Sequence, residues 1–219
     1  MNIAHLKAFK ALKNRYREFN HEPIDHVFRR MMQVKSPELS LVQQPFQESW
    51  SINFNAEKQR LLTQLPQLYN LFHIGSTSIR GMTAKNVIDI LLVTEQSPED
   101  ANLLKQLKTL GYDNYGVSPI SGNAIWCWRI LNDVSYVVHL CNTSNPCIEL
   151  PVAFSQYLNV NTSAQQAYVA EKHKLLARNL DLMSYSVGKL GIYCDFFELA
   201  GAWKKAHCGE LTLPHYETC

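Results

Sequence analysis

A short run of small polar residues, Gly75-Ser76-Thr77-Ser78, directly follows an apolar segment that ends at Ile74. Glycine lets the backbone come close to a bound phosphate, and the amides and hydroxyls behind it can donate hydrogen bonds to phosphate oxygens. Gly75, Ser76, Thr77 and Ser78 are therefore candidate phosphate ligands. The alternative is an ordinary tight turn in which a serine caps a short helix.

A single carboxylate, Asp89, lies fourteen positions after Gly75 in the apolar run VIDILLV. An ionised carboxylate in such a run needs a partner, and a divalent metal (Mg²⁺ or Mn²⁺) bridging nucleotide phosphates would be one. A glycine-serine turn, a gap and an aspartate on a strand resemble the layout of nucleotidyltransferases, in which a metal neutralises charge on the phosphate under attack. Those enzymes usually carry a second acid two residues later, where this chain has Leu91. The alternative for Asp89 is a structural brace held by the turn's own donors.

His139 is the next candidate for the same site, in the run VSYVVHLCN, which we expect to flank the Asp89 strand. Histidine is a poor ligand for Mg²⁺, is acceptable for Mn²⁺ or Zn²⁺, and can act as a general base near neutral pH. We therefore predict Asp89 and His139 as both catalytic and metal-binding residues.

Trp126 and Trp128 alternate along the preceding strand and are expected to share one face, packed under the helices.

A sheet with flanking helices must hold these residues in place. Apolar runs predict strands over 68–74 and 86–93, and a hairpin of 124–131 and 134–141 that turns at Asn132-Asp133. Helical periodicity predicts helices over 1–19, 23–32, 49–65, 98–110, 151–158, 163–179 and 184–206. The pattern indicates an α/β (α+β) fold with a mixed sheet. We divide the chain into an N-terminal helical extension (1–44), a main domain that includes the C-terminal helices (45–207) and a tail (208–219).

The composition is that of a folded protein of the reduced cytoplasm. Of 219 residues, 46% are hydrophobic and 18% are charged, and the formal net charge is only +2, so no DNA partner is expected. The apolar runs are too short for a membrane span, and the N-terminus lacks the apolar core of a signal peptide. Six cysteines form neither a CxxC pair nor a zinc spacing, which favours free thiols in the cytoplasm.

The run HIGSTSIRGMTAK at 73–85, followed by Val-Ile-Asp89-Ile, strongly resembles the signature of the GrpB family, an uncharacterised bacterial group. Later landmarks match as well: Leu110-Gly111-Tyr112, Arg129, His139-Leu140, Tyr157-Leu158, Tyr168 with Lys172, and Tyr185 with Lys189. The resemblance runs from about Val42 to Phe197. Family members usually carry proline where this chain has Arg80, and a second histidine where it has Cys141.

The resemblance implies a nucleotidyltransferase-like fold and a site for ATP or another nucleotide with a divalent metal. Besides the turn, the residues expected to hold the nucleotide are basic: Arg80, Lys85, Arg129, Lys172 and Lys189. A packing role stays open for each, because lone arginines commonly pair at the surface and lysines often extend over core aromatic rings.

Two functions stay open at this point. One is an enzyme that transfers a nucleotidyl group from a nucleoside triphosphate to an unknown acceptor. The other, favoured by Leu91, is a catalytically inactive module that binds a nucleotide or phosphometabolite and interacts with a protein. An RNA-associated factor is a weaker third hypothesis. Residues 1–41 lie outside the resemblance and are a candidate homodimer interface.

Overall fold

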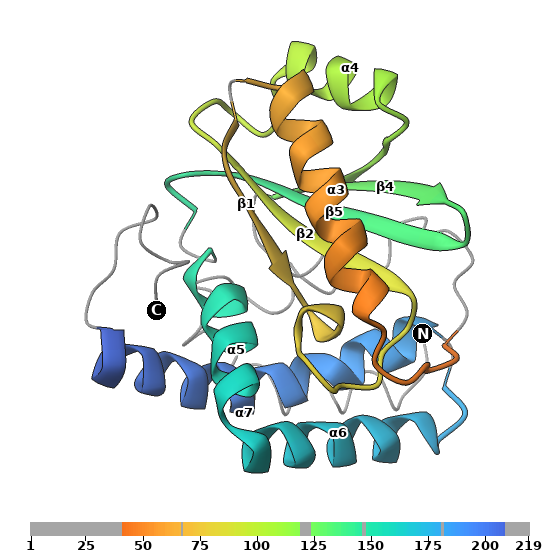
Figure 1. Cartoon of the computed structure of the whole chain (residues 1–219), viewed down its shortest axis with the longest axis vertical. Coiled ribbons are helices and arrows are strands. Elements are labelled where there is room, and N and C mark those ends of the chain that lie inside the picture. Colours follow the sequence, from red (N-terminus) through yellow and green to blue (C-terminus); the bar gives the residue numbers. More distant parts are fainter. Residues whose placement is uncertain (1–40, 67, 119–123, 146–147, 181, 209–219) are drawn as a thin grey trace.

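The computed structural model describes residues 41–66, 68–118, 124–145, 148–180 and 182–208, in which helices flank one mixed sheet (Figure 1). The helices expected at 1–19 and 23–32, and with them the candidate dimer interface, lie outside these residues. The sheet has the order β1-β2-β5-β4-β3. Its strands are β1 (Leu68–Ile74), β2 (Val87–Thr94), β3 (Asp113–Val117), β4 (Ile125–Leu131) and β5 (Val134–Asn142).

Strand β5 lies between β2 and β4 and determines which residues meet at the sheet centre. β2 and β5 run parallel, and the other neighbouring pairs are antiparallel. Parallel neighbours need a long crossover, which α4 (Ala101–Thr109), β3 and β4 supply here. As a result, Asp89 and His139, which are 50 residues apart in the chain, stand on adjacent strands.

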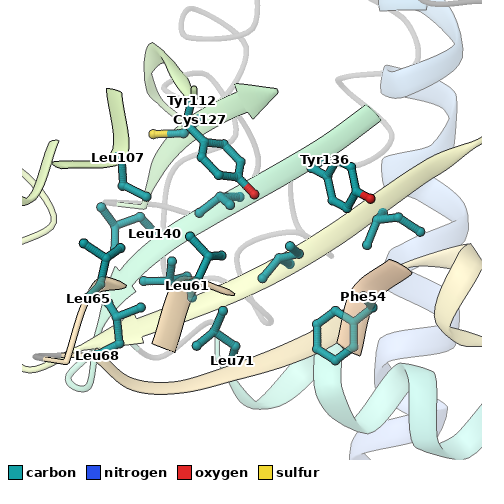
Figure 2. Packing of buried hydrophobic residues seen from close by; sticks show 14 of the residues in the cluster. Phe54, Leu61, Leu65, Leu68, Leu71, Leu107, Tyr112, Cys127, Tyr136 and Leu140 are labelled. Carbon is teal, nitrogen blue, oxygen red and sulfur yellow. The ribbon is translucent and has the colours of Figure 1, made fainter. Parts of the chain in front are cut away.

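One face of the sheet is covered by α3 (Glu48–Gln64) and α4. Ile88, Ile90 and Leu92 alternate along β2 and point into this layer. Figure 2 shows the cluster around them. Phe54 and Leu61 come from α3 with Leu65 just after it, Leu107 from α4, Tyr112 from just before β3, Cys127 from β4, and Tyr136 and Leu140 from β5. This layer is the main apolar core.

The C-terminal helices α5 (Glu149–Val160), α6 (Thr162–Leu176) and α7 (Leu182–Cys208) pack on one another in the lower part of the view in Figure 1. Their shared core is aromatic, and Phe154 contacts Tyr168, Tyr193 and Phe197 edge to face. Ile79 and Met82, from the segment after the Gly-Ser turn, are fully buried in the same cluster. The helical unit is therefore packed directly on the candidate site.

The expected fold class, a mixed β-sheet flanked by helices with a C-terminal helical segment, is confirmed. Asn132 and Asp133 have φ of 50° and 61°, the two positive values that a two-residue hairpin turn of this kind requires. Strand β3 was not predicted, because its sequence, DNYGV, contains Asp, Asn and Gly, which are depleted in strands. It is held at the sheet edge by pairing with β4 alone.

Among the described residues, no helix combines the length and the apolar character that crossing a membrane would require.

Candidate functional site

The Gly75 turn lies against the Asp89 carboxylate. Ile74, the last residue of β1, pairs with Asp89 on β2, so the turn leaves the sheet at that carboxylate. Gly75 has φ of 73°, and a Cβ added to it would stand 2.5 Å from Asp89 Oδ2. Only glycine provides both this conformation and this close approach. The fourteen-residue spacing in the sequence thus becomes a direct contact.

The three hydroxyls of the turn have different roles. Thr77 is buried; its hydroxyl donates to the Val87 carbonyl (2.8 Å) and lies 3.1 Å from His73 Nε2. The Ser78 hydroxyl donates to the Gly75 carbonyl (2.7 Å) and lies 2.9 Å from Ser155 Oγ on α5. These two side chains brace the turn, so only the Ser76 hydroxyl faces the charged part of the site.

His73 belongs to this brace. Its ring stacks on Phe54, with the centroids 4.6 Å apart, and burial lowers the pKa of His73 to about 4 although the Asp89 carboxylate opposes the shift. The imidazole is therefore neutral at physiological pH and serves as a hydrogen-bonding group.

Asp89 and His139 form a polar pair on the face of the sheet opposite α3. His139 Nε2 lies 3.4 Å from Asp89 Oδ1, and the two side chains are 17% and 29% exposed. Leu91, which follows Asp89 on this face, is 3% exposed in an apolar cluster with Val93 and Cys141. On β2, the polar part of this face therefore ends at Asp89.

A carboxylate oxygen and an imidazole nitrogen fit a divalent metal only in part. No group of three or more His, Cys, Asp or Glu side chains is assembled anywhere among the described residues. Mg²⁺ and Mn²⁺ favour about six, mostly oxygen, ligands, so phosphate oxygens and water would have to complete the shell around Asp89. Cys141 adds no ligand to this pair, because it is buried among apolar side chains.

Three lysines from distant parts of the chain converge beside the turn. Lys172 on α6 is only 2% exposed, and its Nζ donates to the Thr83 carbonyl (2.8 Å) and to Ser76 Oγ (3.3 Å). Lys85 precedes β2, and Lys189 projects from α7. Both lie over the Tyr185 ring, with Nζ 5.8 Å and 5.6 Å from its centroid.

The lysines influence one another's charge. Burial, reinforced by Lys189 and Lys85, lowers the pKa of Lys172 to about 7. Burial and Lys189 also lower the pKa of Lys85 to about 8, although the Asp89 carboxylate opposes the shift. Burial acts against the charge of Lys189, but Tyr168, Tyr185 and Asp89 outweigh it and raise the pKa of Lys189. The three lysines thus lie near a single carboxylate, Asp89, so this part of the site carries a net positive charge.

The structure brings together Gly75, Ser76, Lys85, Asp89, His139, Lys172 and Lys189. Arg80 lies at the rim: its side chain is exposed, and its backbone N–H and carbonyl are bonded to Asn159 on α5 (2.8 Å) and Gln165 on α6 (2.6 Å). The sequence analysis missed Tyr193, whose ring lies 4.9 Å from Lys189 Nζ. Its spacing of four from Lys189 on one helix was the signal available.

Arg129, expected to bind the nucleotide, lies on the opposite face of the sheet. Its Nη1 is 3.1 Å from both carboxylate oxygens of Glu57 on α3, which also accepts hydrogen bonds from Arg60 and Tyr112. The reason is strand alternation, because Arg129 points away from the face that Trp126 and Trp128 occupy. Arg129 stabilises the core side of the fold and is not part of this site.

Comparison with known proteins identifies the family to which the chain is similar. The GrpB protein family model matches residues 41–197. The chain is 32% identical to UPF0157 protein YqkA of Bacillus subtilis over 73% of this chain, and spans 47% of that protein. It is 31% identical to a UPF0157 protein of Deinococcus radiodurans, over 69% of this chain and 77% of that one. The crystal structure of conserved protein GrpB from Enterococcus faecalis superposes with a TM-score of 0.65 at 26% identity, over 74% of this chain and 99% of that one.

The match covers the turn, Asp89, His139 and the lysines of α6 and α7, and the chain belongs to the GrpB family.

Proposed function

We propose that this chain binds a nucleoside triphosphate together with a divalent metal and transfers its nucleotidyl group to an acceptor hydroxyl or amine. The observation that carries the proposal is the clustering of Lys85, Lys172 and Lys189 near the single carboxylate of Asp89, with Lys172 hydrogen-bonded to Ser76. Buried cations without matching anions are costly, and a polyphosphate would supply the missing negative charge.

Each residue has a distinct role in this proposal. Ser76 and Lys172 donate hydrogen bonds to phosphate oxygens, and Lys85 and Lys189 balance the remaining charge. Asp89 would hold the metal, with His139 as a second ligand or as the base. When bound, the metal would neutralise charge on the phosphate that is attacked, as a Lewis acid.

The transfer itself is an in-line substitution at phosphorus. The acceptor oxygen or nitrogen forms a bond to the α-phosphorus, the bond from that phosphorus to the β-phosphate oxygen breaks, and pyrophosphate leaves. His139, if it is free of metal, would take the acceptor's proton at Nδ1, because its Nε2 faces Asp89 Oδ1 at 3.4 Å. The Asp89 carboxylate would then stabilise the imidazolium that forms.

A catalytically inactive nucleotide-binding module is the second candidate, and one observation favours it. The position where a second acid would stand is Leu91, which is 3% exposed within apolar packing. Two metals could not be held by carboxylates of this strand. The binding function and the transfer function therefore need separate tests.

Binding is tested by calorimetry with ATP, GTP, CTP and UTP, each with and without Mg²⁺ or Mn²⁺. We expect Asp89→Asn to remove the metal-dependent part of the affinity, roughly tenfold or more for a lost charged ligand. The matched control is Glu99→Gln, an exposed carboxylate next to α4 on the other side of the sheet. Equal metal dependence in wild type and Asp89→Asn would remove Asp89 from the metal site.

Transfer is tested with triphosphates labelled at the α-phosphate, incubated with Mn²⁺ or Mg²⁺ and fractionated cell extract as the source of acceptor. Labelled product and released pyrophosphate in wild type, both absent in Asp89→Asn, would support the enzyme. Metal-dependent binding with no label in any fraction would leave the inactive module as the function.

A further inference from the structure

The segment that follows the Gly75 turn reverses its direction at Arg80. The Met82 N–H donates to the Ile79 carbonyl (3.2 Å), and Gly81, the third residue of this tight turn, has φ of 77°, which fits a type II turn. The side chains of Ile79 and Met82 are fully buried against the C-terminal helices. The N–H and the carbonyl of Arg80 take no part in the turn's own hydrogen bond, so they are left for other partners.

Side chains of α5 and α6 bind these backbone groups. Asn159 Oδ1 accepts the Arg80 N–H (2.8 Å), and Asn159 Nδ2 donates to the Ser78 carbonyl (3.0 Å). Gln165 Nε2 donates to the Arg80 carbonyl (2.6 Å). All three hydrogen bonds run from a helix side chain to the main chain of the turn. Asn159 and Gln165 therefore form a clamp that holds the backbone around Arg80.

The helix face that carries Gln165 also carries Lys172. Gln165, Tyr168 and Lys172 have the spacing i, i+3 and i+7 on α6, which places them on one side of the helix. Tyr168, between the other two, is fully buried. Gln165 is bonded to the Arg80 carbonyl and Lys172 Nζ to the Thr83 carbonyl, so α6 is fixed to one segment at two points, two helical turns apart. The helix cannot slide along the segment without breaking one of these bonds.

Lys172 needs such support to stay in place. Its buried ammonium is repelled by Lys85 and Lys189, and a lysine side chain loses much rotamer freedom when it is ordered. Nζ donates to two neutral acceptors, the Thr83 carbonyl and the Ser76 hydroxyl, and lies 5.7 Å from the centre of the Tyr168 ring. The amine therefore stays at Ser76 only while the segment that carries these acceptors is held against α6.

We propose that Gln165 and Asn159 are positioning residues of the phosphate site, which keep Lys172 buried at Ser76 by clamping the backbone at Arg80. They act through Lys172 and touch no reacting atom. The inference rests on the proposed function only in taking Lys172 as a phosphate ligand. The position of Lys172 itself can be measured without any ligand.

The ligand-free test follows the titration of Lys172 by NMR of the protein labelled with ¹³C-lysine, and the signal is assigned by its loss in Lys172→Met. In wild type the pKa of Lys172 is expected at about 7, since burial and the two neighbouring lysines lower it. Gln165→Ala should raise it toward 10.5, by about one pH unit or more, because the freed amine moves into water. Asn159→Ala combined with Gln165→Ala should raise it further. Gln166→Ala is the matched control, since Gln166 is the exposed neighbour of Gln165 on α6, and should leave the titration unchanged.

The second test is calorimetry with tripolyphosphate. At pH 6, where Lys172 is protonated in every variant that retains it, Gln165→Ala should weaken binding roughly three- to tenfold, because the ammonium is no longer held in place. Proton uptake on binding at pH 8 should fall well below the wild-type value, because Lys172 is already charged in the free variant. In the Lys172→Met background, Gln165→Ala should have no further effect on affinity. A residue that only stabilised the fold would lower the melting temperature and leave proton uptake unchanged.

The outcomes separate this inference from the proposed function. The clamp is overturned if Lys172 titrates alike in wild type, Gln165→Ala and the double variant, or if Gln166→Ala shifts it equally. A shifted titration with unchanged tripolyphosphate affinity at pH 6 would overturn its role in phosphate binding. A shifted titration in a protein whose wild type binds no tripolyphosphate would leave the clamp in place and refute the proposed function. Circular dichroism establishes that each variant folds, and Gln165→Ala alone decides if the double variant does not.

Discussion

The pKa of Lys172 makes polyphosphate binding depend on pH in a way that can be measured. With the pKa lowered to about 7, Lys172 is mostly protonated at pH 6 and mostly neutral at pH 8. A polyphosphate beside Nζ favours the ammonium form and raises the pKa back toward the ordinary value of 10.5. Binding at pH 8 therefore takes up close to one proton, and affinity falls as the pH rises.

The size of the pH dependence follows from the linkage between protonation of Lys172 and binding of the polyphosphate. If the pKa moves from about 7 to about 10.5, the contribution of Lys172 to the binding constant falls about tenfold between pH 6 and pH 8. Proton uptake on binding at pH 8 is ~0.9 by the same calculation. Lys85, with its pKa lowered to about 8, adds only about twofold over this range.

Calorimetry with tripolyphosphate at pH 6 and pH 8, in buffers of different ionisation enthalpy, measures both quantities. Titration of the ligand's own oxygens is common to all variants, so it cancels when Lys172→Met is compared with wild type. Lys174→Met is the control, because Lys174 lies on the same helix and its side chain is 68% exposed. Identical pH slopes and proton uptake in wild type and Lys172→Met would refute the assignment of Lys172 to the phosphate site.

Three further predictions concern the scaffold. Gly75→Ala should lower the free energy of unfolding by about 1–3 kcal/mol and abolish metal-dependent nucleotide binding, because its Cβ would stand 2.5 Å from Asp89 Oδ2. Gly81→Ala is the control: φ at Gly81 is 77° and no atom lies within 4 Å of an added Cβ, so this variant should show backbone strain alone. Thermal denaturation measures the stability of both variants, and calorimetry measures their nucleotide binding. Arg129→Met should lower the free energy of unfolding by about 2 kcal/mol, measured in urea, with nucleotide affinity unchanged; weakened binding in a stable variant would return Arg129 to the site. Burial raises the pKa of its partner Glu57, but hydrogen bonds from Arg60 and Tyr112 outweigh this and lower it below 4.5, so this stability should be lost as the pH falls below that value. Asp133→Gly should raise the free energy of unfolding by about 0.5 kcal/mol, because φ at this position is 61° and glycine adopts positive φ without strain. The melting temperature should rise slightly; a lower melting temperature would contradict the turn assignment.

Local patterns were enough to predict the elements that hold the site. The apolar run of β2 and the hairpin at Asn132-Asp133 were recognisable because buried strands and two-residue turns have strong local signals. Strand β3 lacked such a signal, since its residues favour turns and only pairing with β4 keeps it extended.

The composition of the site was harder to predict than its scaffold. Gly75 and Asp89 could be paired from the motif, but Lys172 lies 96 residues from Ser76, and only the packing of α6 on the turn brings their side chains together. Alternation along β4 correctly separates Arg129 from the two tryptophans. It does not say which face carries the site, because that depends on the helices that cover the other face.

Leu91 determines how the proposed reaction would have to be stabilised. In enzymes with two acids on this strand, metals held by both carboxylates neutralise the charge of the triphosphate. Here the face becomes apolar after Asp89, so the strand can hold one metal at most. In the proposed reaction, the three lysines would supply positive charge where a second metal would otherwise be needed, and burial leaves Lys172 only partly protonated near pH 7 until an anion binds. Neutralising Lys172 should therefore impair transfer even when nucleotide concentration is raised to saturation, whereas a residue that only binds the ground state would be rescued by saturating nucleotide.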